Sequence, residues 1–184
     1  KKSGLLPGDI ARFSAVERHL RAQPPPPIPG FNAHFKIGCL VTAGIDTGSL
    51  QFEKQSLAEQ IRTWVAALDR SSGIPVKRIK LQQRDGYGAT PVLERLHHHL
   101  QETFPGLAVV SDPSPGENRY YQGVQFKIVI NLPGQEREIE IADGGFVDWP
   151  QQLLQNKKER MLCSGLGVEF LLRGMGERVR EVRE

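Results

Sequence analysis

The sequence has little cysteine and no long apolar segment. It contains two cysteines, Cys39 and Cys163, and neither belongs to a CxxC pair. Two isolated thiols are too few for a disulfide framework or a zinc site, so a reducing compartment is favoured. No apolar run approaches the roughly 20 residues of a membrane span, and the lysine-rich start lacks the apolar core of a signal peptide. We therefore expect no membrane contact and a cytoplasmic location, with an organelle as the alternative.

Common catalytic signatures are also missing. The sequence has no nucleophile elbow, no phosphate-binding P-loop and no cysteine–histidine cluster with metal-ligand spacing. Three consecutive histidines, His97 to His99, lie in a predicted helix, where neighbouring side chains point in different directions and cannot all bind one metal. We therefore predict no catalytic triad, no metal and no cofactor.

What remains is an ordinary globular composition. The 184 residues are 39% hydrophobic and 24% charged, which predicts one domain over residues 1–184 with a sizeable core. The formal net charge of +3 is compatible with nucleic-acid binding and equally with a basic soluble domain.

Apolar residues at helical spacing predict three main helices. The first covers 5–21 and carries Ile10, Phe13, Val16 and Leu20, and the second covers 50–69 and ends before Gly73. The third is capped by Thr90, starts with Pro91 and buries Leu93, Leu96 and Leu100. The proline-rich segment 24–30 contains four consecutive prolines, which cannot donate backbone hydrogen bonds. We interpret it as a stiff connector, with a ligand for an aromatic groove as the alternative.

Alternating apolar residues predict the strands. They cover 34–42, 76–81, 107–110 and 124–130, and a last strand lies near 161–168. A hairpin turn at Pro133 and Gly134 leads to a return strand that places Ile139 and Ile141 inward. Consecutive hairpins imply antiparallel pairing. The expected fold class is α+β, an antiparallel β-sheet flanked by helices.

Three motifs in the second half resemble a class II aminoacyl-tRNA synthetase core. They are a Tyr-Tyr strand at 119–126 (RYYQGVQF), a Gly-Gly turn at 143–148 (DGGFVD) and a strand-to-helix junction at 165–172 (GLGVEFLL). Within the class they resemble histidyl-tRNA synthetase and its non-catalytic relative, the regulatory subunit of ATP phosphoribosyltransferase. The first third of the chain matches loosely: segment 4–9 resembles the family's opening and 35–41 the end of motif 2. Motif 1 and the first strand of motif 2 are expected to be absent, with the proline run in their place.

The resemblance implies adenylate formation, but the charges for that reaction differ here. Such sites stabilise phosphate charge with arginines and Mg²⁺. The resemblance places arginines at the positions of Gly116, Phe146 and Phe170, and the motif 2 arginine has no visible counterpart. A glutamine and a glutamate that would hold the amino acid correspond to Lys36 and Leu40. We therefore expect no ligase activity, and expect Phe146 and Phe170 to fill the former nucleotide pocket.

The residues that the resemblance retains are the ligand-binding candidates Tyr120, Tyr121, Glu169 and Asp148. Because neighbouring strand residues face opposite sides, we expect one tyrosine to be buried and the other half exposed. A separate basic strand and loop carries the nucleic-acid candidates Lys77, Arg78, Lys80 and Arg84, and Lys157, Lys158 and Arg160 form a second basic run.

Three functions follow from these patterns. The first is a non-catalytic histidyl-tRNA synthetase-like domain that serves as a regulatory, binding or assembly module and self-associates or binds a partner protein. The second is an amino-acid or nucleotide-binding enzyme or sensor, in which Asp143, Asp148 and Glu169 hold a cation and Tyr121 contacts the ligand. The third is an RNA-binding module that recognises tRNA, which requires both basic runs to share one face. We favour the first.

Overall fold

The computed structural model describes residues 9–22, 24, 32–87, 91–114, 120–131 and 138–174, without the side chains of residues 71, 72, 170, 173 and 174. The described strands form one sheet in the order β1-β2-β7-β6-β5-β3-β4. Their bounds are β1 Ile10–Leu20, β2 His34–Ile45, β3 Val76–Gln83, β4 Ala108–Asp112, β5 Gln122–Asn131, β6 Glu138–Val147 and β7 Glu159–Leu166. The helices are α1 Gln51–Ser72, α2 Val92–Thr103, α3 Trp149–Leu154 and α4 Val168–Gly174.

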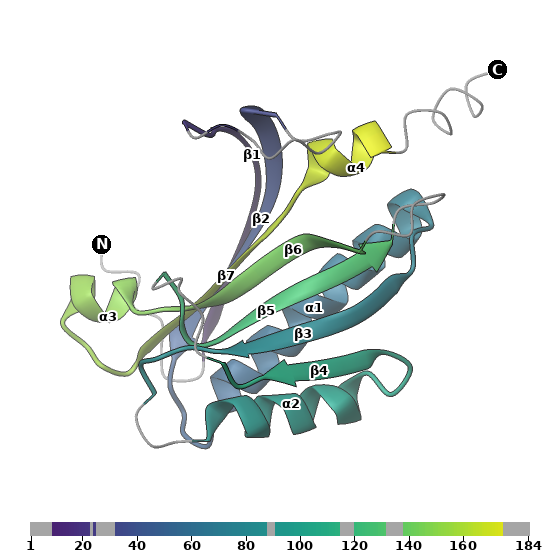
Figure 1. Ribbon diagram of the computed structural model, residues 1–184. Helices are drawn as coiled ribbons and strands as arrows, with labels where there is room; N and C mark the ends of the chain where they lie inside the picture. The colour runs from purple at the N-terminus through teal and green to yellow at the C-terminus, as the bar shows by residue number, and fades with distance from the viewer. Residues whose placement is uncertain are drawn as a thin grey trace.

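This arrangement confirms the expected α+β class. All neighbouring strands pair antiparallel except β3 and β4, which are parallel. The parallel pair arises because α2 lies between β3 and β4 in the chain and returns it to the same end of the sheet (Figure 1). The expectation of a wholly antiparallel sheet was therefore wrong at this one edge.

The predicted first helix is also wrong, because Ile10–Leu20 forms strand β1. β1 pairs antiparallel with β2 along its whole length, from Ile10 opposite Gly44 to Leu20 opposite His34. Strand β1 therefore precedes β2, at the place where the first strand of motif 2 was expected to be absent. The helical spacing of Phe13, Val16 and Leu20 was misleading because these side chains stay 64–67% exposed and no described element buries them. Of the connector 24–30 between β1 and β2, only residue 24 is described.

The other predicted elements are confirmed with small changes of boundary. α1 ends at Gly73, which adopts a left-handed conformation with φ 60° and donates its N–H to Asp69 O. α2 begins after Pro91, whereas Thr90, the predicted cap, lies outside the described residues. In β6, Ile139 and Ile141 are buried and Glu140 is exposed, as the alternation predicts. The predicted turn at Pro133 and Gly134 also lies outside the described residues, and α3 was not predicted.

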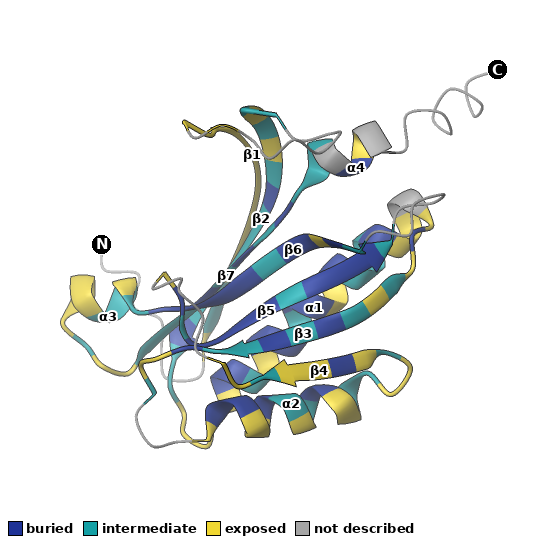
Figure 2. Cartoon of the chain, in the orientation of Figure 1, coloured by how far each residue is buried: buried dark blue, intermediate teal, exposed yellow. Residues whose placement is uncertain are grey.

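A buried polar network fixes α1 on one face of the sheet. Trp64 Nε1 donates to Ser164 Oγ over 2.8 Å, and Ser164 Oγ donates to Gln60 Oε1 over 2.6 Å. Gln60 Nε2 in turn donates to Thr42 Oγ1 of β2. Figure 2 shows the buried residues concentrated on the central strands and the helices behind them, with β1 largely exposed.

Because strand side chains alternate, the neighbours of Thr42 and Ser164 face the opposite side of the sheet. This side is called the open face here, because α1 and α2 cover the other one. It carries Cys39 and Val41 of β2, Cys163 of β7, Asp143 of β6 and Gln125 of β5. The open face is therefore the surface on which a site beside the Tyr-Tyr segment has to be built.

Candidate functional site

Tyr121, Gln125 and Asp143 form a hydrogen-bonded cluster on the open face. Tyr121 Oη donates to Asp143 Oδ2 over 3.2 Å, and Gln125 Nε2 donates to the same oxygen over 3.0 Å. The Tyr121 ring lies against Gly145, where an added Cβ would approach its Cγ within 2.6 Å. A side chain at Gly145 would therefore displace the tyrosine from the cluster.

A buried arginine orients the glutamine of this cluster. Arg84 is only 6% exposed and donates Nη2 to both Gln82 Oε1 and Gln125 Oε1. Because Oε1 of Gln125 accepts from a guanidinium, its amide nitrogen faces Asp143. Nε and Nη1 of Arg84 are buried without a hydrogen-bond partner among the described residues.

The environment shifts both titrating groups of the cluster toward their neutral forms. Burial raises the pKa of Asp143 above its ordinary value, and the hydrogen bonds from Gln125 and Tyr121 oppose this only in part. Burial also raises the pKa of Tyr121, and the neighbouring Asp143 raises it further. Tyr121 is therefore a neutral hydrogen-bond donor at physiological pH.

Asp143 and Gln125 line a cavity of about 280 Å³ between the β1–β2 hairpin and strands β5, β6 and β7. This cavity is called the open-face pocket. Its basic lining residues are Arg21, Lys36 and Lys127. Lys127 pairs with Glu140 at 2.5 Å, and the Arg21 guanidinium lies over the Phe35 ring at 5.3 Å from the centroid. The pocket therefore has a carboxylate beside basic side chains, two of which are already engaged.

The ligand-binding candidates do not converge on one pocket. Tyr121 is 9% exposed and Tyr120 49%, which confirms that one is buried and the other half exposed, although both lie just before β5 rather than within it. Tyr120 packs edge-on against Tyr121 and Trp149, with centroid distances of 4.9 and 5.2 Å. Glu169, in α4, accepts the Lys36 backbone N–H at 3.1 Å. Asp148 lies before α3, accepts from Gln152 and lines a different cavity.

Phe146 was expected to fill the former nucleotide pocket, and this expectation stays a prediction. It is buried on the helix-covered face, with its ring centroid 6.2 Å from that of Tyr87. Asp143 points to the open face three residues earlier, so Phe146 does not fill the open-face pocket. Gly116, Arg119 and the Phe170 side chain lie outside the described structure.

The two positions expected to contact the amino acid also separate. Lys36 is exposed and lines the open-face pocket. Leu40 packs against the hydrophobic core instead. Because they lie four positions apart on β2, alternation turns both side chains away from the face that carries Cys39 and Val41.

Three of the four nucleic-acid candidates form ion pairs. Lys77 and Arg78 both pair with Glu138, and Lys80 pairs with Asp112 at 3.4 Å, whereas Arg84 is buried. Arg78 and Lys77 together lower the pKa of Glu138 to about 2. Figure 1 shows the start of β3 and the α3–β7 loop, which carries the second basic run, at opposite ends of the sheet. RNA binding stays a prediction, and this arrangement weighs against a continuous basic surface.

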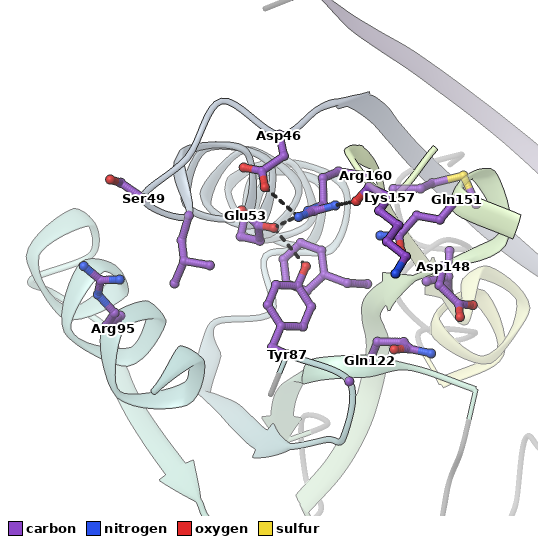
Figure 3. A pocket seen from close by; sticks show the side chains of 15 residues that line it. Asp46, Ser49, Glu53, Tyr87, Arg95, Gln122, Asp148, Gln151, Lys157 and Arg160 are labelled. Atoms are coloured by element: carbon purple, nitrogen blue, oxygen red, sulfur yellow. Dashed lines mark hydrogen bonds and ion pairs between the residues drawn. The ribbon is translucent and has the colours of Figure 1, made fainter. Parts of the chain in front are cut away.

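A second cavity, of about 520 Å³, lies at the start of α1 (Figure 3). Glu53, Tyr87 and Arg160 meet in its wall: Tyr87 Oη donates to Glu53 Oε1 over 2.9 Å, and Arg160 Nε donates to the same oxygen over 3.0 Å. Arg160 Nη2 also pairs with Asp46 Oδ2 at 2.6 Å. Sequence reasoning missed this network because its members come from separate elements and form no local motif. This cavity is called the α1 cavity.

The cysteines show no sign of nucleophilic chemistry. Both are free thiols. Burial raises the pKa of Cys163 to about 11, so its thiol stays protonated at neutral pH. Within the described ranges, no group of three or more His, Cys, Asp or Glu side chains is placed to hold a metal ion.

Comparisons with known proteins identify the fold. No protein-family model and no curated protein matches the sequence. Among solved structures, apo histidyl-tRNA synthetase from S. aureus matches with a TM-score of 0.64 and 16% identity, covering 91% of this chain and 44% of its own. This chain has a class II synthetase-like fold.

Two further solved structures agree with this fold. The putative threonyl-tRNA synthetase ThrRS-1 from Aeropyrum pernix has a TM-score of 0.63, 17% identity and coverage of 97% and 43%. Prolyl-tRNA synthetase from Cryptosporidium parvum, complexed with L-proline and AMP, has a TM-score of 0.52, 10% identity and coverage of 90% and 30%. The synthetase-like chain therefore spans less than half the length of each of these structures. Among its described residues, no helix is long and apolar enough to span a bilayer.

Proposed function

We propose that this synthetase-like chain is a non-catalytic binding module that takes a small amine-bearing ligand, such as an amino acid, in the open-face pocket. The observation that carries the proposal is the Asp143 carboxylate, whose Oδ2 accepts two hydrogen bonds. No described side chain donates to its other oxygen, Oδ1. An ammonium group is the natural partner for such a carboxylate oxygen.

The same carboxylate argues against adenylate formation. That reaction accumulates negative charge on a phosphate and depends on nearby cations. Asp143 repels a phosphate at its own end of the pocket, Lys127 is paired with Glu140, and Arg21 lies over the Phe35 ring. Removing one stabilising donor from such a site typically lowers the rate by about 10²–10³. These charges support binding without ligase activity.

Two assays on the full chain test the proposal. In a thermal-shift screen we expect amino acids to raise the melting temperature, because a ligand that binds only the native state stabilises it. The variant Asp143→Asn should lose this shift, and Asp69→Asn, an exposed helix carboxylate, should retain it. No amino acid stabilising the wild-type protein would contradict the proposed ligand class.

An ATP–pyrophosphate exchange assay separates the module from the alternative, an amino-acid-activating enzyme. We expect exchange no faster than without protein, with each amino acid that gives a thermal shift. Exchange above that background, lost in Asp143→Asn, would establish the enzyme instead.

A tRNA-binding assay at low salt tests the RNA-binding alternative. Binding of tRNA there would support that alternative, and the absence of binding would remove it.

A further inference from the structure

We propose that the α1 cavity is a second ligand site, which binds a small zwitterion with its ammonium group at Glu53 and its acidic group at Arg95 or Lys157. The cavity shares no lining residue with the open-face pocket. Its size, about 520 Å³, is in the range of small-molecule sites. The proposal is therefore independent of the function assigned to the open-face pocket.

Glu53 supplies the first part of the argument. Its side chain is 1% exposed, and both of its described hydrogen bonds reach Oε1. Oε2 is buried and has no hydrogen-bond partner among the described residues. A buried carboxylate oxygen without a donor is unfavourable, so a donor that enters the cavity lined by Glu53 gains a strong hydrogen bond.

The charge around Glu53 determines what kind of donor fits. Asp46 and Glu53 contribute two negative charges and Arg160 one positive charge, which leaves a net charge of −1. Arg160 is fully engaged, because its Nη1 donates to the carbonyls of Lys157 and Glu159. Tyr87 stays neutral, since burial and the neighbouring Glu53 raise its pKa. A cationic donor such as an ammonium group completes this cluster better than a neutral one.

The rim of the cavity supplies the opposite charge. Arg95 of α2 and Lys157 of the α3–β7 loop line the cavity from different sides (Figure 3). Both side chains are exposed, and neither has an acceptor in the part of the chain that the structure describes. The cavity is therefore lined by cations as well as by the carboxylate of Glu53. Simple amines and simple anions each satisfy only one half of this arrangement.

Isothermal titration calorimetry on the full chain tests the proposal with two matched probes, ethanolamine phosphate and β-alanine. Both carry an amine two carbons from an acidic group, so the tighter probe identifies a phosphate or a carboxylate as the preferred acid. We expect at least one probe to bind and ethylamine and inorganic phosphate to bind at least about tenfold more weakly, because each lacks one charged hydrogen bond.

Variants locate the probe. Glu53→Gln should weaken binding about tenfold or more, and Arg95→Ala or Lys157→Ala should weaken it by a similar factor. Lys158→Ala, a neighbouring exposed lysine outside the cavity lining, should leave binding unchanged. If Glu53→Gln does not fold, judged by circular dichroism, the two exposed cations still decide the question.

Three results would overturn this inference. They are the absence of binding by both probes at millimolar concentration, binding that neither Arg95→Ala nor Lys157→Ala weakens, and binding that only Asp143→Asn weakens. The last result would place the probe in the open-face pocket and so leave the proposed function intact. Loss of the amino-acid thermal shift in Asp143→Asn with unchanged probe binding would support both sites separately.

Discussion

At the scale of single residues, Ser164 links α1 to the sheet. Its hydroxyl accepts from Trp64 and donates to Gln60, and all three side chains are buried. We expect Ser164→Ala to lower the free energy of unfolding by about 1–3 kcal/mol, because it leaves a buried donor and a buried acceptor unpaired. Urea denaturation measures this loss, and Ser111→Ala, at an exposed position in β4, serves as control. Equal stability of both variants would show that the network contributes little.

Asp143 sets a pH dependence of stability. Because burial raises its pKa in the folded state, the native protein binds this proton more tightly than the unfolded chain. Stability relative to Asp143→Asn is therefore greatest below the ordinary pKa of 3.8 and decreases as the pH rises through the folded-state value. Denaturation of both proteins between acidic and neutral pH measures the difference. A difference that grows with pH in favour of the wild type would contradict the raised pKa.

The residue-level site could be predicted only in part. The contrast between buried Tyr121 and half-exposed Tyr120 matches the prediction, but both residues precede β5, so it does not come from alternation within that strand. The Gln125–Asp143 contact depends on the register of β5 against β6, which local pattern does not specify. The position of Phe146 on the opposite face likewise became clear only from the pairing.

At the scale of elements, β1 is an exposed edge strand. Its outer edge pairs with no described strand, and Phe13, Val16 and Leu20 are exposed. Unpaired backbone groups beside apolar side chains form a template for strand pairing. This edge supports self-association of the module, which stays a proposal.

Size-exclusion chromatography with light scattering tests that self-association. We expect the wild-type chain to form dimers at high concentration and Phe13→Lys combined with Leu20→Lys to remain monomeric, because charges on an edge strand oppose pairing. Leu153→Lys, at an exposed leucine of α3, controls for charge and lost apolar area. A wild-type protein that stays monomeric at every concentration would remove the dimer.

Most elements were predictable, and β1 shows why one was not. α1, α2 and the β5–β6 pair have periodic apolar faces that are buried as the pattern predicts. In β1 the same spacing occurs in residues that remain exposed. The helical periodicity there therefore did not correspond to a buried face. Pairing with β2 determined its conformation, and that partner lies beyond a proline-rich connector.

At the scale of the whole molecule, one sheet joins all seven described strands, and we expect a single cooperative unfolding unit. The sequence contains two tryptophans, of which Trp64 is buried and Trp149 is 41% exposed. In Trp149→Phe, the fluorescence of Trp64 therefore reports the α1–sheet contact alone. We expect its urea transition to coincide with that of far-ultraviolet circular dichroism. Two separated transitions would show more than one folding unit within residues 1–184.

The sequence by itself determined the α+β class, most elements and the resemblance to a class II synthetase, because these depend on local periodicity and short motifs. The tertiary structure alone decided which side chains share a pocket. Asp143 accepts a hydrogen bond from Tyr121 on the open face, whereas Asp148 lines the α1 cavity. Glu53 accepts one from Arg160, which lies 107 positions away in the sequence. The physical reason is that strand order and register bring distant residues together, and neither is encoded in a local pattern.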